Sequence, residues 1–224
     1  SLLALNMLNA FTYQADYDTT GASYFFLALF SSNLENAYKY AQKYIQHHPG
    51  DVRGVLLYGN LLYNSSEWID ALFQYSRILW AEEKNIDAQF GTGMCLFNLQ
   101  EYEDAISAMR KALKIDPYNH SAHYYLGLSL MVINKYEKAI SSFTQSLLLD
   151  PDNSNTYLNL GKSYYEIGKI IQAQEAFNRV VMIDPEYGEA HYYLGLINEN
   201  IMKIDRAVES YTRARELSFE IEDV

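Results

Sequence analysis

The spacing of apolar residues along the chain predicts helices that come in pairs. Residues 86–119 begin with an apolar series at the three- and four-residue steps of an amphipathic helix, namely Phe90, Met94 and Phe97. A polar break follows at 98–101, and a second helical series begins at Tyr102. Pro117 ends this second helix, because proline disfavours a helical residue before it and lacks the backbone donor. The segment is therefore predicted to be a helix–turn–helix unit.

The same unit returns along the chain with a fixed period of 34. Three residue types mark the period at fixed offsets: Ala37, Ala71, Ala105, Ala139, Ala173 and Ala207; Gly59, Gly93, Gly127, Gly161 and Gly195; and Pro49, Pro117, Pro151 and Pro185. Glu83 stands where the remaining proline is expected. A period of 34 is typical of a helix–turn–helix solenoid, in which each unit packs on its neighbours in one continuous array. We expect the two antiparallel helices of a unit to approach closely at the glycine and the alanine.

The period divides the chain into six units. Their expected bounds are 18–51, 52–85, 86–119, 120–153, 154–187 and 188–221. The first unit is degenerate, because Phe25 stands where a glycine is expected. Residues 1–17 continue the pattern with apolar residues in the positions of a second helix, which predicts an extra N-terminal helix. This helix either caps the array or belongs to a preceding unit from which the chain has been cut.

The repeated residues resemble the tetratricopeptide repeat (TPR) family, whose pattern combines Leu-Gly, aromatic, alanine and proline positions within one repeat. The string His-Tyr-Tyr-Leu-Gly, which begins at His123 and again at His191, is an example. The resemblance extends from Asp18 to about Leu217. It implies an all-α, right-handed α-solenoid of about six stacked TPR units plus the N-terminal helix. Because the family uses one scaffold for many partners, the resemblance says little about the partner of this chain.

The resemblance also implies a row of ligand-contacting positions on the first helices, which line the concave face of such arrays. We expect the peptide-binding groove to be formed by Phe26, Asn60, Tyr63, Phe90, Met94, Phe97, Tyr124, Leu128, Met131, Lys162, Tyr165 and Tyr192. This row is mostly apolar and aromatic, which suits an amphipathic helix or an extended hydrophobic peptide. Two other interpretations stay open: these side chains pack between neighbouring units, or the groove holds a terminal helix or a second copy of the chain.

One TPR subtype binds acidic C-terminal peptides through lysine, asparagine and arginine side chains on successive first helices. Here the corresponding positions hold mostly Leu, Phe, Tyr and Met, and Asn60 and Lys162 are isolated remnants three units apart. The chain is therefore not expected to be a receptor of that subtype.

Net charge and cysteine content limit the classes of partner and the compartment that the sequence allows. The formal net charge of −11 argues against nucleic acid or an anionic membrane surface as the main ligand. The apolar stretches are too short to predict membrane insertion. Cys95 is the single cysteine, so no intramolecular disulfide can form, which favours the cytoplasm or another reducing compartment.

Candidate catalytic and metal-binding residues are better explained by packing. His120 and His123 are close enough along a helix to suggest a metal site, but His123 and His191 share one repeat position that calls for a large residue. Cys95 lies among apolar residues, without a histidine in its unit, and is expected to be a buried inert thiol. No phosphate-binding or dinucleotide-binding glycine motif occurs in the sequence. We therefore expect neither enzymatic activity nor a cofactor.

The sequence thus favours a non-catalytic scaffold for protein–protein interaction that binds a peptide or helix in its concave groove. Two alternatives remain. One is a structural subunit that self-associates, with its N-terminal end as the candidate contact. The other is a regulatory segment of a larger protein.

Overall fold

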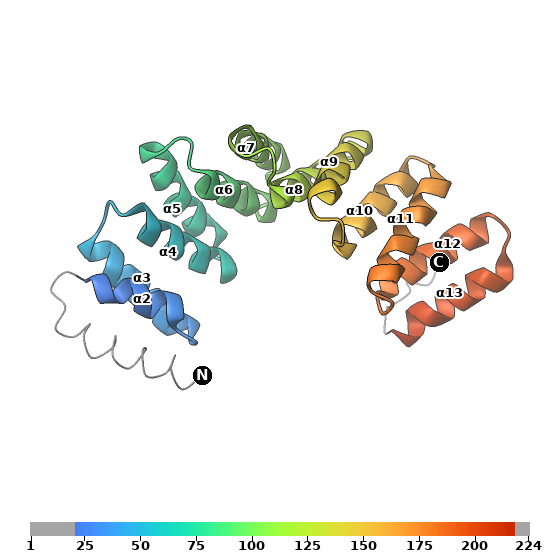
Figure 1. The fold of residues 1–224 in the computed structure, drawn as a ribbon, viewed down its shortest axis with the longest axis horizontal. Coiled ribbons are helices and arrows are strands. Elements are labelled where there is room, and N and C mark those ends of the chain that lie inside the picture. Colours follow the sequence, from blue (N-terminus) through green and yellow to red (C-terminus); the bar gives the residue numbers. More distant parts are fainter. Residues whose placement is uncertain (1–20, 218–224) are drawn as a thin grey trace. The chain divides into compact units, whose positions relative to one another are not determined.

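The computed structural model of the protein describes residues 21–217, and all regular structure in that range is α-helical (Figure 1). The first helices of successive pairs are α2 (Ala22–Phe30), α4 (Val52–Asn64), α6 (Ile86–Asn98), α8 (His120–Val132), α10 (Ser154–Glu166) and α12 (Gly188–Asn200). The second helices are α3 (Leu34–His47), α5 (Trp68–Ala81), α7 (Tyr102–Ile115), α9 (Tyr136–Leu149), α11 (Ile170–Ile183) and α13 (Ile204–Glu216). The N-terminal helix expected at 1–17 lies outside the described residues.

The helices form two compact units, which meet in sequence at Ile115 and Asp116. Unit 1 contains α2 to α7 and unit 2 contains α8 to α13. Within each unit, both helices of a pair pack on each other, and the second helix also packs on the first helix of the next pair. This arrangement confirms the prediction of an all-α array of TPR-type helix pairs. The division into six repeats with the bounds given above stays a proposal.

In pairs two to six, the glycine that marks the 34-residue period on the first helix admits a large side chain from the second helix of its own pair. A Cβ atom on Gly127 would lie 2.5 Å from the ring of Phe143, and one on Gly161 would lie 2.7 Å from the ring of Phe177. Both rings are fully buried. The close approach expected from the sequence therefore depends on a glycine and the large residue 16 positions later, with the invariant alanine buried beside them.

In the first pair, the large and the small residue at this contact are exchanged between the two helices. Phe25 occupies the glycine position of α2, and Ala41 occupies the large-residue position of α3. Ala41 is almost fully buried, and the Phe25 ring packs against Tyr44 with 5.2 Å between ring centroids. The degenerate appearance of this pair in the sequence thus corresponds to a different but complete packing.

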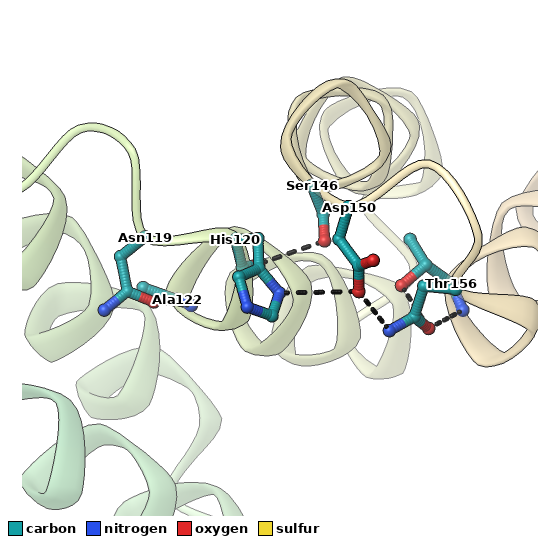
Figure 2. A network of polar contacts seen from close by, with 7 residues as sticks. Asn119, His120, Ala122, Ser146, Asp150 and Thr156 are labelled. Atoms are coloured by element: carbon teal, nitrogen blue, oxygen red, sulfur yellow. Dashed lines mark hydrogen bonds and ion pairs between the residues drawn. The ribbon is translucent and has the colours of Figure 1, made fainter.

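Asparagine side chains cap the N-termini of three of the first helices. The Oδ1 atoms of Asn85, Asn119 and Asn153 accept hydrogen bonds from backbone N–H groups inside the first turn, as N-cap residues do. Figure 2 shows the surroundings of Asn119, Asp150 and Thr156 in unit 2. Asn153 also donates to Asp150 Oδ2 at 2.9 Å, and His120 Nδ1 lies 3.8 Å from the same oxygen. These contacts fix the connection between α9 and α10.

Candidate peptide-binding groove

A hollow of about 600 Å³ opens between the first helices α4 and α6 of unit 1. It is lined by Leu56, Asn60, Tyr63 and Asn64 from α4 and by Asp87, Phe90, Gly91 and Met94 from α6. Apolar and aromatic side chains thus share this surface with amide groups, a phenol and a carboxylate. Such a mixture suits a ligand with an apolar anchor and a few directed polar groups.

Four of the groove residues expected from the sequence meet in this hollow: Asn60, Tyr63, Phe90 and Met94. Leu56 occupies the same repeat position as Phe90 and so also belongs to the expected row, whereas Asn64, Asp87 and Gly91 were not predicted from the sequence. A signal for the first two was present, because Asn64 is one helical turn after Asn60 and Asp87 is three residues before Phe90, so each shares a helix face with a predicted residue.

Asn60 is held in place by a side chain from the second helix of its pair. Tyr75, which is fully buried, donates its hydroxyl hydrogen to Asn60 Oδ1 at 2.7 Å. Its ring passes so close to α6 that a Cβ atom on Gly91 would lie 2.5 Å from it. Gly91 therefore gives Tyr75 the space to reach the hollow. Burial also raises the pKa of Tyr75 above its usual value, so its hydroxyl stays a donor at neutral pH.

Tyr63 is oriented in a similar way by the neighbouring first helix. Asn98 Nδ2 donates to the Tyr63 hydroxyl oxygen at 3.0 Å and to the carbonyl oxygen of Met94 at 3.0 Å. These bonds connect α4 to α6 along one edge of the hollow. Because Asn60 and Tyr63 are both positioned before any ligand arrives, less conformational entropy is lost when they bind one.

In unit 2 the same row of positions is occupied by contacts within the protein. Lys162 Nζ lies 2.5 Å from Glu189 Oε1 and 5.6 Å from the ring centroid of Tyr193. Tyr193 in turn stacks on the buried Phe177, with 4.8 Å between centroids and 11° between planes. Burial is the main reason why the pKa of Tyr193 is raised to about 12. The isolated lysine that the sequence analysis singled out is therefore engaged by an acid on the next first helix.

The other row residues of unit 2 are half-buried. They are Tyr124, Leu128, Met131, Tyr165 and Tyr192. The Tyr124 hydroxyl accepts a hydrogen bond from Asn159 at 3.4 Å. The ring of Tyr165 lies 5.9 Å from Tyr193, and the ring of Tyr192 lies 6.0 Å from Tyr211. Packing between helix pairs, one of the interpretations left open by the sequence, thus applies to Tyr124 and Tyr165, whereas Tyr192 contacts the second helix of its own pair.

The two remaining predicted groove residues belong to unit 1 but do not line the hollow. Phe26 on α2 is exposed, and its ring meets Phe25 edge-on with 5.9 Å between centroids. Phe97 on α6 is half-buried and packs against Tyr102, with 5.6 Å between the rings.

The histidines and the cysteine that were considered as metal-binding or catalytic residues make contacts within the fold or are buried. His123 and His191 each place Nε2 3.0 Å from the carbonyl oxygen of the proline six residues earlier. Cys95 is fully buried, and this burial raises the pKa of its thiol to about 12. Among the described side chains, no group of three or more His, Cys, Asp or Glu residues is placed to hold a metal ion. Within residues 21–217, no helix has both the length and the apolar character needed to cross a membrane.

The helix pairs, their packing order and the row of first-helix positions define an α-solenoid repeat protein. The sequence pattern of the family described as "Anaphase-promoting complex, cyclosome, subunit 3" matches residues 31–112 and, about one repeat further on, residues 68–146. The pattern described as "Tetratricopeptide repeat" matches residues 134–197. The chain belongs to the tetratricopeptide repeat family.

Solved structures with the same fold are similar over most of their length. MamA 41-end from Desulfovibrio magneticus RS-1 has a TM-score of 0.71 at 24% identity, over 78% of this chain and 99% of that one. The Pseudomonas aeruginosa pilF protein has a TM-score of 0.77 at 17% identity, over 88% and 91% of the two chains. YrrB, described as a TPR protein with an unusual peptide-binding site, has a TM-score of 0.68 at 22% identity, over 79% and 91%. At these identities the similarity shows the fold alone. None of the curated protein sequences compared with the chain matches it significantly.

Proposed function

We propose that the protein is a non-catalytic interaction scaffold that binds a peptide or helix of another protein in the hollow between α4 and α6. The single observation that carries this proposal is the hollow itself, where four residues of the expected groove row come together. Membership of a family of interaction repeats supports it, and so does the peptide-binding site that the description of YrrB records for a protein of the same fold.

The arrangement suggests how binding proceeds. Phe90 and Met94 offer apolar surface to an anchor side chain of the ligand, and burial of such a side chain contributes about 1.5–3 kcal/mol. Asn60, held by Tyr75, retains its amide N–H groups as donors for a ligand carbonyl. The ligand then undergoes most of the ordering, since the groove side chains are fixed beforehand.

A selection experiment tests this proposal. Peptides long enough for about four helical turns are selected from a random phage library on the full-length chain. Synthetic copies are then titrated against the protein and its variants by fluorescence anisotropy. Replacing both Phe90 and Met94 with Ser is expected to weaken the selected peptides at least 10-fold, which corresponds to about 1.4 kcal/mol.

The matched control changes the equivalent positions of unit 2, Tyr192→Ser with Leu196→Ser. We expect this pair to change peptide affinity less than about 3-fold. Circular dichroism establishes that both double variants are folded. Unchanged affinity in the folded Phe90/Met94 variant, or an equal loss in both variants, would contradict binding in the unit 1 hollow.

A further inference from the structure

The outward face of α5 carries three large apolar side chains in solvent. Ile69, Phe73 and Trp80 are 69%, 61% and 92% exposed, respectively. Their successive spacings of four and seven place them on one side of the helix, along about 16 Å of its length. None of them belongs to the row of first-helix positions described above.

The repeat shows that the scaffold does not require apolar residues at these positions. In α7 the equivalent residues are Glu103, Ser107 and Lys114, all exposed. In α3 and α13 all three positions are charged or carry an amide, α9 keeps one apolar residue and α11 keeps two. Among the six described second helices, α5 alone has three. Since these three positions are exposed to solvent in every pair, packing within the protein does not explain the apolar stripe on α5. Exposed apolar stripes of this kind mark interaction surfaces.

Acidic residues lie at both ends of the stripe. Glu67 and Asp70 are at the start of α5, and Glu82 and Glu83 directly follow its last residue, all exposed. Among residues 21–217, none of these four carboxylates is within ion-pair distance of a cation. Acids at a helix C-terminus are unfavourable for the helix dipole. Glu82 accepts a hydrogen bond from Asn85 Nδ2 at 2.9 Å, as Asp150 does from Asn153, so the connection to α6 explains Glu82 but not Glu83. Glu83 also replaces the proline that four other repeats have here.

The cation on this helix is turned away from the stripe. Arg77 Nη1 donates to Gln74 Oε1 at 2.7 Å, and Nη2 donates to the carbonyl oxygen of Pro49 at 3.2 Å. Beyond Trp80, the loop to α6 forms an open hollow of about 600 Å³, lined by Glu82, Glu83, Lys84, Asn85, Ile86 and Asp87. The exposed indole thus precedes a loop in which three acids outnumber one lysine, a combination that suits a Lys or Arg side chain through cation–π and ionic contacts.

We propose that the outward face of α5 is a second docking surface, which binds a basic amphipathic helix of a partner protein. The partner's apolar side chains cover Ile69, Phe73 and Trp80, and its Lys or Arg side chains meet the acids at the two ends. About four helical turns are needed to span the 14 residues of α5. Charge argues against a second copy of the chain here, because pairing α5 with itself would bring acidic ends together.

Trp80 provides a local reporter for the test. The chain has two tryptophans, so Trp68→Phe leaves Trp80 as the sole one. The full-length Trp68→Phe protein is titrated with an amphipathic Leu/Lys peptide of about five helical turns and with a Leu/Glu peptide of the same length and pattern. The proposal predicts a blue shift of Trp80 emission with the Leu/Lys peptide alone, and weaker binding of that peptide at about 0.5 M salt.

A variant with unchanged net charge tests whether the Leu/Lys peptide binds at α5 rather than elsewhere on the protein. Ile69→Glu, Phe73→Ser and Trp80→Lys together give α5 the residues that α7 has at these positions, and are expected to weaken a labelled Leu/Lys peptide at least 10-fold. The matched control on α11, Ile171→Glu with Met182→Lys, and the groove variant with Phe90 and Met94 replaced by Ser are expected to keep its affinity. The proposal for α5 can therefore hold even if no peptide binds in the hollow between α4 and α6.

Four outcomes would overturn the proposal. They are equal binding of the Leu/Glu peptide, an absence of binding by the Leu/Lys peptide, an equal loss of affinity in the α11 variant, and a blue shift of Trp80 on raising the protein concentration without peptide. The last outcome, together with a dimer in sedimentation, would assign the stripe to a second copy of the chain.

Discussion

The two units carry the same row of first-helix positions, yet the row borders a hollow between α4 and α6 in unit 1 and makes ion-pair and ring contacts in unit 2. In unit 1, Asn60 and Phe90 border a hollow of about 600 Å³. In unit 2, Lys162 is paired with Glu189, and Tyr165 and Tyr192 pack against other tyrosines. A shared repeat position therefore does not imply a shared role.

The difference can be traced to residues behind the row. Gly91 leaves space on α6 where α8 and α12 have Tyr125 and Tyr193. Tyr75 uses that space to reach Asn60, whereas Tyr193 fills the equivalent space and stacks on Phe177. The same scaffold thus produces a preorganised hollow in one unit and a consolidated aromatic cluster in the other.

The largest effect is expected from Phe177→Ala, which removes the buried ring under the unit 2 cluster. Loss of a fully buried phenylalanine costs about 3–5 kcal/mol of unfolding free energy. Urea denaturation followed by circular dichroism measures it. Phe73→Ala is the matched control, because the same change on the exposed face of α5 is expected to stay within about 0.5 kcal/mol. A loss below about 1 kcal/mol for Phe177→Ala, well under the usual cost of such a cavity, would mean that this cluster does not consolidate unit 2.

A smaller effect is expected from Tyr75→Phe, which removes the hydroxyl that holds Asn60. The change should lower the unfolding free energy by about 1 kcal/mol, and it should weaken groove-selected peptides because Asn60 is no longer oriented. Tyr211→Phe breaks a more exposed bond to Glu199 in unit 2 and should cost less and leave peptide affinity unchanged. Equal peptide affinities for the two variants would show that Asn60 needs no positioning.

The smallest effect is expected from Lys162→Met. The Lys162–Glu189 pair is partly exposed, with about a quarter of each side chain in solvent, so it contributes roughly 0–1 kcal/mol. Thermal unfolding at low and high salt measures this contribution. A loss above about 2 kcal/mol, more than such pairs contribute, would show that the ion pair, rather than the aromatic packing, closes the row in unit 2.

Much of the fold could be predicted from the sequence because the packing rules repeat with every helix pair. The glycine and alanine positions marked where helices approach, and the resemblance to the TPR family assigned Asn60, Tyr63, Phe90 and Met94 to the groove row. The first pair could be assigned to the array only by its phase, since Phe25 and Ala41 exchange sizes and therefore conceal the pattern.

Other features could not be predicted, because they depend on contacts between helices or on backbone geometry. The reach of Tyr75 to Asn60 past Gly91 involves three helices, and one sequence does not show which side chains meet. The turns inside the pairs also share a backbone conformation that the sequence does not reveal. One repeat position has a positive φ in every turn from the second pair on, at Ser66, Gln100, Asn134, Gly168 and Met202. Since only one is glycine and one asparagine, residue type gave little sign of the left-handed turn.

Whether the ligand binds in the unit 1 hollow is tested most directly with the methionine methyl groups as reporters. Met94 lies in the hollow and Met131 in the row of unit 2, and methyl-labelled methionine distinguishes them by NMR once each is assigned by substitution. On saturation with a library-selected peptide, binding in the hollow predicts a shift of the Met94 methyl signal and an unchanged Met131 signal. A shift of Met131 with Met94 unchanged would contradict it.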